Sequence, residues 1–262
     1  MFAIGTALPH DTATLHSGLA HGLAPLGLGR DAAVIDGEFP QLAAIRVNLT
    51  NARFHRALDF ARPASGAQSL CFARTVEIQG APVHVESVPV DLQLKAEDVV
   101  FGAADAANGP GKVLVLERAA QGTLELSVAR TELENALLEA GRAAAKEKGA
   151  DVQSVELLLQ SENPRALAVQ AQVTAKAMFF TTTVTISGCL EIDDQLNVRL
   201  RGLHCEGDGM IGKMAAGALR PQFEKLENRS IPLGRAVAGL SLRDVRLEGG
   251  DHLRVHATFG AA

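Results

Sequence analysis

The chain has 262 residues, enough to bury a hydrophobic core in one large β-rich domain or two small ones. Its net charge of −5 and its lack of Trp and Tyr disfavour nucleic-acid binding, which favours basic surfaces and aromatic stacking residues. No apolar run approaches the roughly 18 residues that indicate a membrane span, and residues 1–10 lack the pattern of a signal peptide. We therefore expect a cytoplasmic protein if the sequence is complete, and a periplasmic one if an export signal has been removed.

The first segment, residues 12–29, has four leucines at helical spacing, but Gly18, Gly22 and Pro25 weaken any helix. We expect a marginal helix or a turn-rich lead-in before a single domain over residues 30–262. Strands should dominate that domain, because apolar and polar residues alternate with the period of a half-buried strand. The alternating segments are 45–50, 83–85, 88–94, 124–128, 155–159, 167–173 and 184–186.

Two hairpins are expected near the C-terminal half of the chain. Residues 190–192 and 196–200 flank the polar turn Asp193-Asp194-Gln195. Residues 242–247 and 253–259 flank a turn that contains Gly249 and Gly250. Such short connections favour antiparallel pairing.

Two segments predict firm helices. Thr131 and Glu134 form a capping box that starts a helix over residues 131–148. The second helix spans residues 209–228, and Pro221 inside it should kink it or split it. Strands and helices do not alternate as in parallel α/β enzymes, so the predicted class is α+β.

Three patterns suggest chemistry but have simpler explanations. Residues 207–212 match G-x-G-x-x-G, yet Asp208 disfavours phosphate and no βαβ unit surrounds them, which favours a turn. His252 and His256 would stand roughly 13 Å apart on one strand face, too far for one metal ion. His204 beside Cys205 has no partner pair nearby, and Cys71, Cys189 and Cys205 are expected to be reduced thiols. We predict no catalytic residue, no metal and no cofactor.

The order of elements over residues 30–260 resembles the bacterial DUF2993 family of phospholipid-binding proteins, placed in the tubular lipid-binding (TULIP) superfamily. Gly37-Glu38-Phe39-Pro40-Gln41-Leu42 is similar to a family segment before the first long strand. Residues 131–137 resemble its helix start inexactly, because Asn135 follows Leu133 by two positions. Ile231-Pro232-Leu233 and residues 239–247 are similar to its closing proline, strand and hairpin.

The resemblance implies a strongly curved antiparallel sheet wrapped around two long amphipathic helices, with an apolar groove for acyl chains. The function implied is non-catalytic binding or transfer of a phospholipid or fatty acyl chain, with peripheral contact to a membrane surface. The residues expected to line the groove are Leu133, Leu137, Ala140, Leu157, Leu159, Val169, Val173, Val184, Ile186, Met214, Leu219 and Phe223.

Two alternatives stay open. One is a scaffold with a solid core, in which Met214, Leu219 and Phe223 pack tightly or lie on the surface instead of facing a cavity. The other is a hydrolase acting on a lipid-like substrate, for which His55, His84 and His204 are the candidate general bases.

Overall fold

A computed structural model describes residues 2–55, 63–64, 66–107, 110–146, 150–177, 180–227, 229–233 and 241–260. Strands account for 63% of the protein and helices are few, so it is β-rich. This confirms the strand-rich part of the predicted α+β class.

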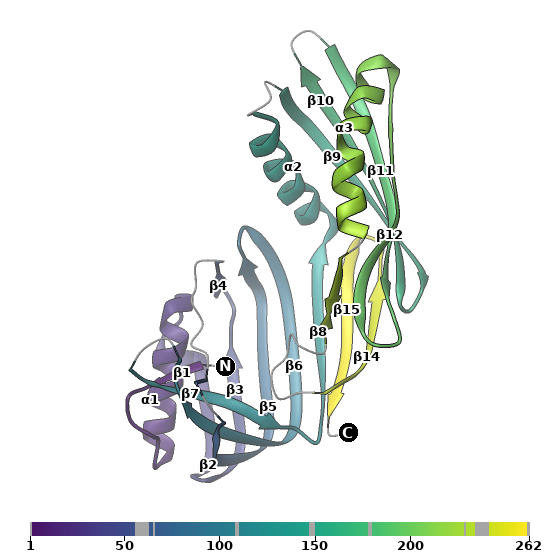
Figure 1. The fold of residues 1–262 in the computed structure, drawn as a ribbon. Coiled ribbons are helices and arrows are strands. Elements are labelled where there is room, and N and C mark those ends of the chain that lie inside the picture. Colours follow the sequence, from purple (N-terminus) through teal and green to yellow (C-terminus); the bar gives the residue numbers. More distant parts are fainter. Residues whose placement is uncertain are drawn as a thin grey trace. The chain divides into compact units, whose positions relative to one another are not determined.

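The chain divides into two compact units, whose elements are labelled in Figure 1. Unit 1 comprises Met1–Leu126, Gly234–Asp244 and His256–Ala262, and unit 2 comprises Ser127–Leu233 and Val245–Val255. Residues 1–29 lie within unit 1. That residues 30–262 act as one lipid-binding domain stays a prediction.

Unit 1 contains one α-helix, two short 3₁₀ helices and most of the first sheet. Its elements are β1 (Phe2–Gly5), α1 (Thr12–Leu23), η1 (Ala24–Leu26), η2 (Arg30–Ala32), β2 (Ala33–Glu38), β3 (Gln41–Asn48), β4 (Arg53–Phe54), β5 (Gln68–Val85), β6 (Val88–Asp105) and β7 (Lys112–Arg118). Three strands have residues in both units, namely β8 (Gln121–Ala129), β14 (Leu242–Glu248) and β15 (His252–Gly260).

Unit 2 contains the second sheet and two longer helices. Its elements are α2 (Arg130–Lys146), β9 (Ala150–Asn163), β10 (Ala166–Ala177), β11 (Phe180–Ile192), β12 (Asn197–Gly207), α3 (Gly209–Glu227) and β13 (Ser230–Pro232). The second sheet has the order β13-β12-β11-β10-β9, so consecutive strands are neighbours throughout. The first sheet follows the order β14-β15-β8-β6-β5-β3-β2, with β1, β4 and β7 paired off this path.

The prediction of a purely antiparallel sheet is wrong in unit 1. Strands β3 and β5 pair in parallel, from Gln41 opposite Phe72 to Asn48 opposite Gln79, and β4 also pairs in parallel with β5. The physical reason is the connection between β3 and β5, which spans residues 49–67 and is long enough to return the chain in the same direction. In unit 2 the pairings of the described residues of β9–β13 are all antiparallel, as predicted.

Helix α1 is firmer than its sequence suggested. Asp11 caps it through a 2.7 Å bond from the Thr14 amide, and Leu15, Leu19 and Leu23 are buried in the core of unit 1. Gly18 lowers helix propensity, but a Cβ there would lie 3.0 Å from Cβ of Ile4 in β1. The glycine therefore allows close packing of α1 on β1, which a local propensity argument misses.

Both predicted hairpins are present, and both predicted helices lie within two residues of their expected ends. Asp193 holds the first hairpin turn, since its carboxylate accepts bonds from the amides of Gln195 and Asn197, each at 2.9 Å. Helix α3 is continuous from Gly209 to Glu227, so Pro221 does not split it. The predicted bend at Pro221 stays a prediction.

Candidate apolar binding site

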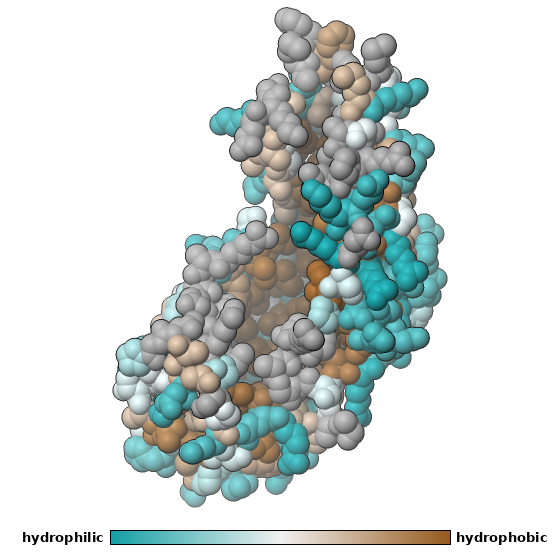
Figure 2. Space-filling model, in the orientation of Figure 1, coloured by the Kyte–Doolittle hydropathy of each residue, from teal (hydrophilic) through white to brown (hydrophobic). Residues whose placement is uncertain are grey.

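The second sheet has one apolar face, built by cross-strand pairs whose side chains share a side. Leu157 pairs with Ala171, Ala171 with Ile186, and Ile186 with Cys205, giving an apolar row across four strands. A second row, next to the first on the same side of the sheet, runs through Val155, Val173, Val184 and Gly207. We call the side of β9–β12 that carries these rows the apolar face. In Figure 2, hydrophobic residues are visible between α2 and α3 on this unit.

Helix α2 packs along β9, the last strand of the second sheet. Glu134 accepts a 2.8 Å bond from the Leu157 amide, Arg130 donates to the Leu157 carbonyl at 3.2 Å, and Arg142 donates to the Val152 carbonyl at 2.9 Å. These side chains satisfy backbone groups that an edge strand would otherwise leave open. Helix α2 is therefore fixed to one edge of the sheet.

Helix α3 packs on β12 through the G-x-G-x-x-G segment. A Cβ on Gly212 would lie 2.6 Å from the carbonyl carbon of Gly207, so both glycines are needed for this close approach. Gly209 has a left-handed φ of 65°, and the Gly212 amide bonds the Asp208 carbonyl at 3.1 Å. The segment is the strand-to-helix turn that the sequence favoured, and its glycines serve packing.

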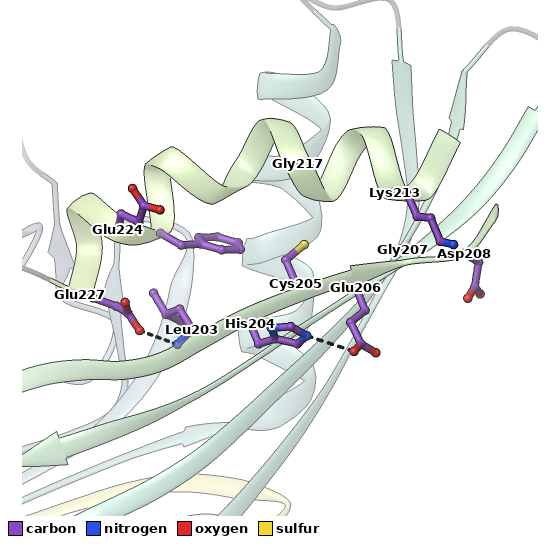
Figure 3. Close-up of a pocket in the computed structure, with 11 residues that line it drawn as sticks. Leu203, His204, Cys205, Glu206, Gly207, Asp208, Lys213, Gly217, Glu224 and Glu227 are labelled. Carbon is purple, nitrogen blue, oxygen red and sulfur yellow. Dashed lines mark hydrogen bonds and ion pairs between the residues drawn. The ribbon is translucent and has the colours of Figure 1, made fainter. Parts of the chain in front are cut away.

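A pocket of about 740 Å³ lies between α3 and β12, and we call it the α3 pocket (Figure 3). Its volume falls within the range of about 300–1,000 Å³ typical of small-molecule sites. The side chains of Leu203, Cys205 and Phe223 form apolar parts of the pocket wall. Gly207 and Gly217 also line the pocket, and because they have no side chain they do not fill it. Because Cys205 belongs to the apolar face, the floor of the pocket continues into that face.

Charged residues lie at the two ends of the α3 pocket. Asp208 and Lys213 stand at the start of α3, whereas Glu224 and Glu227 stand near its end (Figure 3). Glu227 accepts a 2.7 Å bond from the Leu203 amide and so fixes the second end of α3 to β12.

The residues predicted to line a groove fall into three groups. Leu157, Leu159 and Val184 are buried, while Leu133, Val169, Val173, Ile186 and Phe223 are half-buried. Leu137, Ala140 and Met214 are exposed, with Met214 at 71%. The side chain of Leu219 lies outside the described part of the chain. The sheet residues thus share a face, whereas Phe223 is the one predicted residue among those that line the α3 pocket, whose strand side is formed by β12.

Residues 201–207 of β12 contribute to the site but were not predicted to do so. Leu203, Cys205 and Gly207 alternate with His204 and Glu206, which is the period-2 signal that identified the other strands. In the structure His204 bonds Glu206 at 3.0 Å, and both side chains extend from β12 on the side away from α3 (Figure 3).

The cysteine thiols near the site are not activated. Desolvation raises the pKa of Cys205, and burial together with Glu162 and Glu191 raises the pKa of Cys189. A nucleophilic cysteine requires the opposite shift, because the thiolate is the reactive form. His204 offers Cys205 no base, since the two side chains leave the strand on opposite sides.

The other candidate histidines are not among the residues that line the α3 pocket. His55 pairs with Glu86 in unit 1, 3.7 Å away, and His84 belongs to β5. His252 and His256 lie on β15 as predicted, and His256 pairs with Glu125 at 3.4 Å. Among the described residues, no group of three or more His, Cys, Asp or Glu side chains could hold a metal ion.

A family model for LmeA-like phospholipid-binding proteins matches residues 72–258, which is most of the chain. The chain belongs to the LmeA-like phospholipid-binding family. The match includes all of unit 2's helices and second sheet, and it confirms the resemblance to a lipid-binding family. The Gly37–Leu42 segment lies outside the matched residues, where it forms the end of β2 and the turn into β3. Comparisons with curated proteins and with solved structures found no match.

No helix among the described residues is long and apolar enough to cross a membrane.

Proposed function

We propose that unit 2 holds the acyl chains of a phospholipid against the apolar face, and that the α3 pocket receives part of them. One observation carries this proposal. The apolar face continues into a 740 Å³ pocket, and its central residues Val169, Val173 and Ile186 are only half-buried. Half-buried aliphatic side chains beside a cavity gain free energy when a ligand removes them from water.

The charges suggest how the lipid is oriented. Lys213 at the start of α3 attracts a phosphate, although Asp208 stands at the same end. Glu224 and Glu227 at the other end disfavour an anionic headgroup. The headgroup should therefore lie near Lys213, and the acyl chains should extend past Cys205 toward Phe223.

We also propose that the protein transfers the lipid and does not catalyse a reaction on it. A carrier needs a cavity and exchange with a membrane but no reacting group, and the raised pKa of Cys205 agrees with that. We further propose that the second sheet curves around its bound lipid, as expected for tubular lipid-binding domains. Contact with a membrane surface would supply the lipid.

Native mass spectrometry of freshly purified protein, followed by lipid extraction, tests this proposal. We expect a co-purified phospholipid, and we expect Phe223→Asp to abolish its binding while the protein stays folded, because Phe223 is only half-buried. Leu226→Asp is the control, since Leu226 lies on the same helix and is 38% exposed. Absence of lipid together with failure to bind a fluorescent fatty acid would overturn the proposal. Unfolding of Phe223→Asp alone would favour the scaffold with a solid core.

A further inference from the structure

Two large apolar side chains are exposed at one end of unit 2. Phe180, the first residue of β11, is 58% exposed, and Met214 in the second turn of α3 is 71% exposed. The start of α3 lies against the start of β11, because Thr182 donates a 3.1 Å bond to the Asp208 carbonyl. We call this end of the unit, which carries Phe180 and Met214, the apolar tip. Their exposure at the same end of the unit makes this end a candidate contact surface.

The apolar tip continues the proposed lipid site. Phe180 lies on the same side of β11 as Val184 and Ile186, because side chains two residues apart share a face. Lys213 of the α3 pocket is the residue before Met214. The tip is thus placed where the apolar face and the pocket reach the end of the unit.

Exposed lysines surround the tip. Lys176 pairs with Thr181 next to Phe180, Lys213 precedes Met214, and Lys146 ends α2. Two described aspartates, Asp151 opposite Lys176 and Asp208 at the start of α3, stand beside these three lysines. A local excess of lysine beside exposed aromatic and aliphatic side chains is complementary to an anionic lipid surface.

We infer that the apolar tip docks unit 2 on the surface of an anionic phospholipid membrane. Phe180 and Met214 enter the interface between headgroups and acyl chains, while Lys146 and Lys176 face phosphates. This inference rests on the proposed function, since docking at this end brings the α3 pocket to the source of its lipid. If the apolar tip bound another protein, nothing would require it to lie at the end of the α3 pocket. Its position there therefore favours a membrane over a protein partner.

Co-sedimentation of the full chain with vesicles tests the inference. The vesicles are phosphatidylcholine alone and phosphatidylcholine with phosphatidylglycerol. We expect preferential binding to the second kind, and a loss of about tenfold in apparent affinity for Phe180→Ser. Lys176→Glu should weaken binding to the anionic vesicles only. Ile231→Ser is the matched control, because Ile231 is 61% exposed and lies at the opposite end of the sheet, paired with Val198.

A second measurement separates this inference from the proposed function. Binding of a soluble fluorescent fatty acid should be the same in Phe180→Ser as in the unchanged protein, because the probe does not require a membrane. Equal sedimentation of Phe180→Ser and Ile231→Ser would overturn the docking inference and leave lipid binding standing. The inference would also be overturned if the unchanged protein did not bind vesicles and formed a dimer that Phe180→Ser converted to a monomer. That result would assign the apolar tip to self-association.

Discussion

The Glu134 carboxylate lies 2.8 Å from the Leu157 amide nitrogen and fixes helix α2 to the edge of the second sheet. Glu227 fixes α3 to β12, at 2.7 Å from the Leu203 amide nitrogen and past the β12 residues that pair with β13. Each glutamate accepts a hydrogen bond from a backbone amide of the sheet. The two helices are thereby held at β9 and β12, while Val169, Val173 and Ile186 on β10 and β11 stay half-buried.

The first prediction concerns this edge bond. Glu134→Ala should destabilise the protein by about 1–3 kcal/mol, because it leaves the Leu157 amide without its acceptor. Urea unfolding followed by circular dichroism measures the change. Glu139→Ala, an exposed glutamate on the same helix, is the control and should have little effect. Equal unfolding midpoints for the two variants would show that the bond does not hold α2 in place.

The second prediction concerns the glycine turn. Gly212→Ala should displace the start of α3 from β12 and lower the thermal unfolding temperature, because the new Cβ would lie 2.6 Å from the Gly207 carbonyl carbon. Gly217→Ala should be neutral or stabilising by about 0.5–1 kcal/mol, since nothing lies within 4 Å of its Cβ and alanine favours helix. The reverse order of unfolding temperatures would contradict the packing role assigned to Gly212.

The third prediction concerns pH. Hydrogen bonds from Asn197 hold the pKa of Asp193 below its usual value. A lowered folded-state pKa means that the ionised carboxylate stabilises the hairpin above the usual aspartate pKa, and that this stabilisation is lost as the pH falls through the lowered value. The difference in unfolding temperature between the unchanged protein and Asp193→Asn should therefore be present at neutral pH and shrink in strong acid. A difference independent of pH would contradict this role.

The fourth prediction tests the proposed headgroup position. Lys213→Glu should weaken binding of phosphatidylglycerol more than binding of phosphatidylcholine, because the variant opposes the added negative charge. Lys225→Glu, on the same helix and exposed, is the control. Titration with short-chain phospholipids measures both affinities. Equal losses for the two lipids in Lys213→Glu would place the headgroup elsewhere.

The sequence predicted the local elements of unit 2 well, because alternation and capping are local signals. The apolar alternation of β9, β10 and β11 placed Leu157, Val173 and Ile186 on strands, and Thr131 with Glu134 marked the start of α2. It did not predict which strands pair, so the parallel pairing of β3 with β5 was missed. Pairing across a long connection depends on tertiary packing, which periodicity does not encode.

The candidate site was predictable only in part for the same reason. Phe223 was expected to line a groove and lines the α3 pocket, whereas the predicted residues of β9, β10 and β11 share one face of the sheet and are not among the residues that line this pocket. Exposure of Met214 could not be deduced, because a helical stripe does not reveal how far the helix extends beyond its sheet. Glu134 was predicted to cap α2 together with Thr131, whereas the bond that its carboxylate accepts from Leu157 depends on a strand 23 positions away.

Cys205 and Cys189 provide the most direct test of the central claim, because they report on opposite sides of one sheet. Cys205 lines the α3 pocket, whereas Cys189 bonds Glu162 at 3.8 Å and pairs across from Ala168, outside the pocket. Both have a raised thiol pKa, so alkylation is measured at mildly alkaline pH by peptide mass spectrometry. Loading with phospholipid should slow alkylation of Cys205 and leave the rate at Cys189 unchanged. If lipid binds and the rate at Cys205 does not change, the acyl chains do not occupy the α3 pocket.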